Sequence, residues 1–201
     1  MSKIAIEGNA SGTGTFTIAS PNSNSSRTLS LPDGTGTFVV NGINSAITAA
    51  TAQASTSGTS IDFTGIPSWV RRITVMLSQV STNGTSIPQI QIGSGSVDTT
   101  GYLSGSSFVT TAAGVNATTA TSGFIIFSNF AGASLQGGII LSLLGSNTWV
   151  AQGVVFQATS TANVVQTAGT KTLSGTLDRV RITTVNGTDT FDAGTINILY
   201  E

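Results

Sequence analysis

Apolar and polar residues alternate along several short stretches in the last two thirds of the chain. In residues 69–77, the side chains of Ile73, Val75 and Leu77 share one face, and residues 87–92 alternate in the same way. A period of two is typical of β-strands with one buried face. These stretches therefore predict strands of an all-β fold.

Two further stretches, 124–127 and 139–144, are apolar at nearly every position. A strand that is apolar on both faces needs cover on both, so we expect the core on one side and a neighbouring subunit on the other. The Asn83–Gly84 pair predicts a hairpin, and the remaining strands are expected at 149–156, 177–184 and 194–200. Short strands at this spacing indicate an antiparallel, jelly-roll-like β-sandwich over 59–201.

The first part of the chain repeats one phrase, Gly-Thr-Gly-Thr-Phe, at 12–16 and 34–38. Such segments bury too little to fold alone and gain stability by stacking on copies of themselves. We therefore predict an extended, β-rich N-terminal arm over 1–42 in an oligomeric protein. Residues 43–58 are expected to form a spacer, either a short helix packed against other chains or an extended linker.

Charged residues make up only 7% of the 201 residues, and the net charge is −1. Seven dispersed Lys and Arg residues do not suit nucleic-acid binding. The chain contains no Cys and no His, which excludes disulfides, thiolate nucleophiles, His-liganded metals and His-based triads. With no signal peptide or membrane span visible, we expect a protein made in a host cytoplasm, without membrane insertion.

Residues 8–37 resemble the segment that opens many tail-fibre and virion proteins of tailed bacteriophages, and residues 61–67 and 187–201 resemble the terminal domain of such proteins. The resemblance implies homotrimers, with the arm toward the particle and a globular β-domain outward. It transfers no catalytic residue.

Candidate receptor contacts lie at Trp69 and in the flexible loop 93–103, which contains Asp98 and Tyr102. Binding residues concentrate on loops that a rigid scaffold supports. For both aromatic side chains a packing role stays open, whereas Trp149 is expected to pack in the core.

Phe124 and Ile126 are candidate subunit-interface residues, because their strand is expected to be covered twice. Arg179 and Arg181 share one face of another strand. They are expected to pair with Asp178 or Asp62, and a subunit-interface ion pair is the alternative.

Asp189 and Asp192, with Asp178 nearby, form the single cluster of carboxylates. They could hold Ca²⁺ or serve as a glycosidase pair, but Asp and Asn are also ordinary residues of hairpin loops. We predict no metal, no cofactor and no enzymatic activity. The resemblance favours a short tail-fibre component that adheres to a host-surface glycan or protein and assembles with other virion proteins. A capsid-decoration or head-fibre protein is the alternative.

Overall fold

The computed structural model describes residues 11–15, 17, 22, 24–26, 28, 47–110, 114–159 and 162–201. The chain divides into two compact units, Met1–Phe38 and Val39–Glu201, and every described strand belongs to the second. Most of the arm predicted over 1–42, and the first four residues of the predicted spacer, lie outside the described residues.

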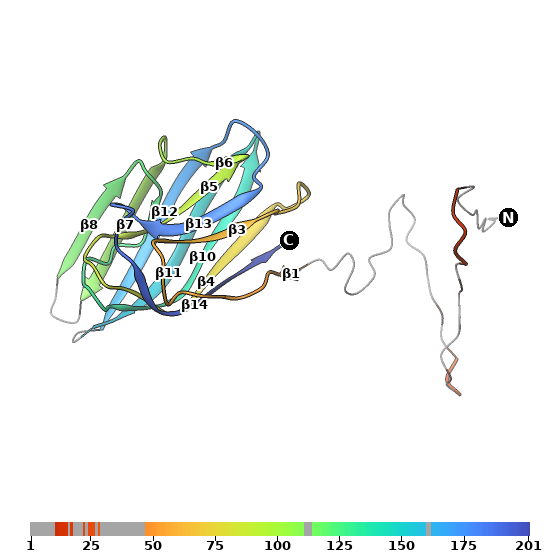
Figure 1. The fold of residues 1–201 in the computed structure, drawn as a ribbon, viewed down its shortest axis with the longest axis horizontal. Helices are drawn as coiled ribbons and strands as arrows, with labels where there is room; N and C mark the ends of the chain where they lie inside the picture. Colours follow the sequence, from red (N-terminus) through yellow and green to blue (C-terminus); the bar gives the residue numbers. More distant parts are fainter. Residues whose placement is uncertain are drawn as a thin grey trace. The chain divides into compact units, whose positions relative to one another are not determined.

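The described residues form fourteen β-strands and no helix, arranged in two antiparallel sheets (Figure 1). The larger sheet has the order β1 (Thr48–Ala49), β14 (Phe191–Tyr200), β4 (Arg72–Thr82), β10 (Ser134–Gly145), β11 (Thr148–Ala158), β12 (Asn163–Thr172), β7 (Leu103–Thr110) and β8 (Val115–Ala120), and β2 (Gln53–Ala54) also pairs with β14. The smaller sheet has the order β3 (Ser60–Thr64), β13 (Arg179–Thr184), β5 (Pro88–Ser94) and β6 (Ser96–Val97), with β9 (Phe124–Ile125) also paired to β5. The prediction of an all-β protein is confirmed.

Strands from the beginning of the domain pair with strands from its end. β1 and β2 pair with β14, β3 with β13, β4 with β10, and β5 with β9. Successive pairs alternate between the two sheets. Of the remaining strands, β6 pairs with β5, and β11, β12, β7 and β8 extend the larger sheet beyond β10, which gives the domain one unusually wide sheet.

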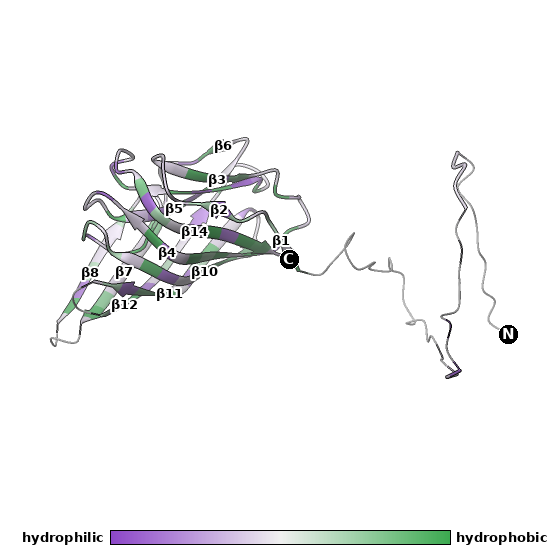
Figure 2. Cartoon of the chain, turned by 60° about the horizontal axis from the view of Figure 1, so that its bottom comes forward, coloured by the Kyte–Doolittle hydropathy of each residue, from purple (hydrophilic) through white to green (hydrophobic). Residues whose placement is uncertain are grey.

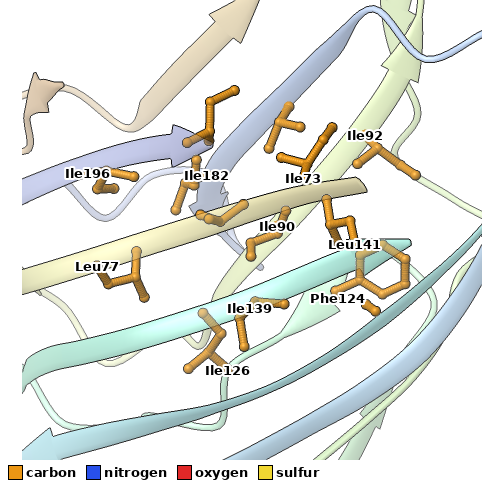
Figure 3. Packing of buried hydrophobic residues seen from close by; sticks show 14 of the residues in the cluster. Ile73, Leu77, Ile90, Ile92, Phe124, Ile126, Ile139, Leu141, Ile182 and Ile196 are labelled. Atoms are coloured by element: carbon orange, nitrogen blue, oxygen red, sulfur yellow. The ribbon is translucent and has the colours of Figure 1, made fainter. Parts of the chain in front are cut away.

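One hydrophobic cluster joins the two sheets (Figure 3). The larger sheet contributes Ile73, Ile139 and Ile196, and the smaller sheet contributes Ile90 and Ile182, all at most 1% exposed. Full burial of such a side chain stabilises a fold by about 1.5–3 kcal/mol relative to exposure. The cluster is therefore the main element that holds the sheets together.

The hairpin predicted at Asn83–Gly84 is wrong. This turn connects β4 of the larger sheet to β5 of the smaller sheet, and the two strands do not pair. The carboxylate of Asp189 accepts a hydrogen bond from the backbone N–H of Ser86 at 2.8 Å, which fixes the crossing. Alternation identifies a strand with one buried face, but it does not say which sheet that strand joins.

A helix is not found in the described part of the predicted spacer. Residues 48–49 and 53–54 are instead short strands on β14, and the Asn197 side chain donates a hydrogen bond to the Ala50 carbonyl at 3.1 Å. Thr and Ser dilute the helix formers here, while the edge of β14 offers backbone partners. The domain thus begins earlier than the predicted residue 59.

Candidate functional site: an uncharged sheet face

The strands β10, β11, β12, β7 and β8 lie side by side (Figure 2). The first four have one face on the core, whereas the edge strand β8 has no buried residue. Along β11, Trp149, Ala151 and Val155 point into the core, whereas Gln152 and Val154 point away from it. We call the side of these five strands that faces away from the core the outer face.

The strand register aligns the side chains of the outer face in rows that cross the sheet. One row consists of Phe156, Val164, Val109 and Val115, one residue from each of β11, β12, β7 and β8. We call this row the apolar ridge. Directly opposite residues in a sheet lie about 4.5–5.5 Å apart at Cβ, so the ridge is continuous.

A groove of about 710 Å³ lies beside the apolar ridge. It covers the next two rows of the outer face, where many side chains are small. Its lining includes Gly105, Ser107, Ala117, Ala168, Gln152 and Val154. The outer face therefore combines a raised apolar row with a shallow, mostly uncharged depression.

Large exposed hydrophobic side chains concentrate on this face. Eleven of them are exposed among the described residues, and seven lie here: Leu103, Val109, Val115, Leu144, Val154, Phe156 and Val164. Scattered exposed hydrophobic residues are normal, but a contiguous group marks an interaction site.

The outer face also lacks charge. Residues 99–170 contain no Asp, Glu, Lys or Arg, and this stretch supplies all of β7, β8, β10 and β11. Lys171, near the end of β12, is only 8% exposed and lies on the core side. No charged side chain therefore lies on the outer face of these five strands.

The smaller sheet presents the opposite character. Arg181 binds the Asp62 carboxylate with Nε at 2.7 Å, and Arg179 binds Asp178 at the same distance. These are the partners expected from the sequence, within one chain. The hydrogen bond from Arg179 lowers the pKa of the Asp178 carboxyl, and Asp178 in turn raises the pKa of Arg179. The side of the smaller sheet that faces away from the core thus carries charge, whereas the outer face of the larger sheet does not.

Tyr102 is fully buried, so the prediction that its ring contacts a receptor is wrong. Its hydroxyl accepts a hydrogen bond from the Ile92 N–H at 2.8 Å, and it lies 3.0 Å from the carbonyl oxygen of Asp98. Its ring packs edge-on against Phe124 with centroids 5.0 Å apart. Burial raises the pKa of the Tyr102 hydroxyl well above its ordinary value.

Asp98 and Lys171 form a largely buried ion pair at 2.8 Å. The Lys171 ammonium also donates to the Thr100 carbonyl at 2.9 Å and lies 5.2 Å from the centre of the Tyr102 ring. The Asp98 carboxylate is therefore already engaged in an ion pair within the domain.

Trp69 is 49% exposed, and its ring lies 5.9 Å from that of Tyr200. Of the three side chains predicted to meet a receptor, it alone presents a broad accessible surface.

The interface roles predicted for Phe124 and Ile126 are wrong, because both side chains are fully buried within the domain. β9 pairs with β5 of the smaller sheet, and Thr167 of β12 donates a hydrogen bond to the Ile125 carbonyl at 2.8 Å. Ser104 of β7 accepts the Ile125 N–H at 3.1 Å. Both apolar faces of this short segment are thus covered by the chain's own sheets.

Asp189 lies in the turn before β14, and Asp192 lies at the start of β14. Asp189 accepts hydrogen bonds from Ser86 and from the Asn186 amide at 2.7 Å, and Asp192 accepts one from Ser81. Within the described ranges, no group of three or more acidic residues is arranged to hold a metal ion.

The outer face was missed in the sequence because it depends on the register of five strands. One property visible in the sequence could have indicated it, namely the absence of charge throughout residues 99–170. Ordinary soluble domains carry about a quarter charged residues.

No protein-family model matches the sequence, no curated protein matches it, and no solved structure matches it. In the part of the chain that the structure describes, no helix is both long and apolar enough to cross a membrane.

Proposed function

We propose that this protein is a non-enzymatic structural subunit of a tailed-bacteriophage virion, a short tail-fibre component that assembles as a homotrimer. The observation that carries the proposal is the outer face. A sheet face that is uncharged across five strands and carries a row of exposed apolar side chains suits a subunit of a larger assembly better than a protein that acts alone.

We further propose that the domain is a jelly-roll β-sandwich with inserted strands. In a jelly roll of eight strands, the first pairs with the last and the second with the seventh, continuing inward. The pairings of β1 and β2 with β14, β3 with β13, β4 with β10, and β5 with β9 follow this order. Strands β7, β8, β11 and β12 are then insertions that widen the larger sheet, and β6 is a short addition to the smaller one.

Host-surface adhesion is proposed for the surfaces outside the outer face. Trp69 is the candidate contact that is accessible, and an exposed indole can pack on a sugar ring or on an apolar side chain of a host protein. In the assembled virion, which forms in the host cytoplasm, this part of the domain stays accessible when the outer face is covered.

The test is to locate the protein in intact particles with a gold-labelled antibody raised against the full chain. Label on the tail, together with loss of host adsorption in a Trp69→Ala variant, is the expected result. Label at regular positions on the capsid would replace the tail-fibre role with that of a decoration or head-fibre protein. Particles that carry no label would overturn the proposal.

A further inference from the structure

We infer that the outer face binds further copies of this same chain, with the apolar ridge of one copy seated in the groove of the next. This inference rests on the proposed function, which supposes that the chain assembles. It adds the surface that makes the contact, the outer face, and the partner, a second copy of the chain.

The first argument is shape. The apolar ridge carries four medium or large side chains, and the groove beside it is lined by residues such as Gly105, Ala117 and Ala168. Side chains at the centre of a protein interface interlock as densely as a protein interior. A raised row next to two rows that contain several small residues provides this complementarity when two copies meet.

The second argument is charge. A charged side chain from a partner would lose its water on this face and find no opposite charge, which costs several kcal/mol per ion. The partner must therefore be uncharged over a comparable area. The outer face itself meets this requirement, because residues 99–170 contain no charged residue.

The third argument concerns polar groups. Gln152 and Gln166 lie among the apolar residues of the groove, and Ser107 and Thr119 line it as well. Buried amides and hydroxyls need hydrogen-bond partners. A second copy brings amides and hydroxyls, whereas a lipid surface offers none in its hydrocarbon region.

A reciprocal contact, in which each ridge enters the groove of the other copy, is isologous and closes at two copies, whereas a contact in which the ridge of each copy enters the groove of the next copy is heterologous. Contacts of this kind generate a closed ring when the rotation between copies allows it. A ring of three copies agrees with the proposed homotrimer.

The first experiment compares two substitutions in the full-length chain. Val164→Lys places a charge in the middle of the apolar ridge, and Val185→Lys places one at a residue of similar exposure, 47% against 44%, outside the outer face. In sedimentation velocity, we expect the wild type and V185K to form the same oligomer of the 20.2 kDa chain. We expect V164K to sediment as a monomer with unchanged circular dichroism.

A wild type that stays monomeric at every concentration would overturn the inference, as would a V164K variant that assembles like V185K. A wild-type monomer that instead binds vesicles of neutral phospholipid, or another virion protein, would assign a different partner to the face.

The second experiment does not depend on loss of assembly. Because the chain contains no Cys, a variant with Val164→Cys and Ala117→Cys carries one thiol on the ridge and one in the groove. Within one chain these positions are two strands and one row apart, roughly 12 Å, beyond the about 7 Å limit for a disulfide. Mild oxidation is expected to yield covalent species of up to three chains on a non-reducing gel.

The control pairs Val185→Cys with Ala117→Cys and is expected to give no such species. Cross-linking that is equal in the control, or that stops at two chains, would overturn the arrangement of ridge in groove. A chain that passes both experiments but is missing from virions would overturn the proposed function and leave the self-contact intact.

Discussion

The hydroxyl of Tyr102 ties the loop after β6 to the middle of the smaller sheet. It accepts the Ile92 N–H of β5 and lies against the Asp98 carbonyl, while its ring packs on Phe124. Asp98 in turn holds Lys171 of the larger sheet. A few polar side chains thus connect the two sheets at a place where the core is otherwise apolar.

Replacing Tyr102 with Phe should lower the free energy of unfolding at neutral pH by about 1–3 kcal/mol, because the Ile92 N–H loses its acceptor. The pH dependence should change as well. Since the folded-state pKa of Tyr102 is raised above the ordinary value of about 10, its contribution is complete below pH 10 and is lost as pH rises further. Thermal melts from pH 7 to 11 should show a smaller alkaline decline in Y102F than in the wild type. Equal declines would assign the alkaline loss to other groups.

Replacing Asp98 with Asn should destabilise the domain by about 1–3 kcal/mol, because it leaves the Lys171 ammonium buried without its counter-charge. The cost falls below that of a fully buried pair because the Asp98 side chain is 29% exposed. Urea unfolding measures the effect. Adding Lys171→Met to D98N should restore part of the loss, whereas a further loss in the double variant would contradict this account.

At the scale of single elements, the pairing of β14 with β4 contains two register shifts, at Phe191/Ala193 and Ala193/Thr195. Gly194 lies at the second, with φ of +96°. A side chain there would collide with the backbone carbonyl of Gln79 on β4. A bulge of this kind bends the strand and increases its local twist.

Gly194→Ala should therefore cost about 2 kcal/mol or more, because strain in φ is added to a backbone collision. Gly132→Ala is the matched control: its φ is +69°, and no atom lies within 4 Å of the added Cβ. The control should lose about 1 kcal/mol. Chemical denaturation of the two variants provides the comparison, and equal losses would mean that the collision relaxes without cost.

Strand positions and buried faces were largely predictable because both depend on local alternation. Ile73, Val75 and Leu77 share the core face as expected, and Trp149 is buried as expected. The sequence could not show whether Phe124 is buried within its own domain or at a contact with another subunit, because an apolar residue is expected in both places. The apolar ridge was likewise out of reach, since it brings Phe156, Val164, Val109 and Val115 together only through the register.

At the scale of the domain, the five strands of the outer face carry no charge, whereas Arg72 and Glu201 form an ion pair where β4 begins and β14 ends in the same larger sheet. Ion pairs involving Asp62, Arg179 and Arg181 lie on the smaller sheet, and the outer face of the larger sheet has none. Surface ion pairs contribute little to the free energy of unfolding. We therefore interpret the charges on the smaller sheet as groups that keep this side of the domain exposed to solvent. The neutral side is then left for protein contacts.

An assembly through the outer face should respond weakly to salt. Screening weakens contacts between charges, and this contact has none. We expect the dissociation constant of the oligomer to change less than about threefold between 0.05 and 0.5 M NaCl, and we expect sulfate to strengthen it because sulfate favours apolar burial. Sedimentation equilibrium at several salt concentrations tests this, and a tenfold weakening in NaCl would indicate a charged interface elsewhere.

The pairing of Thr48 with Tyr200 has a practical consequence for attaching cargo to this protein. Because these two residues are directly opposite each other, a tag or enzyme fused after Glu201 would emerge beside the point where the chain enters the domain. Surface display of a passenger should use an internal loop instead. The exposed turn at 129–132 before β10 is one such site, since it precedes the end of β10 that lies away from Tyr200 in the strand register.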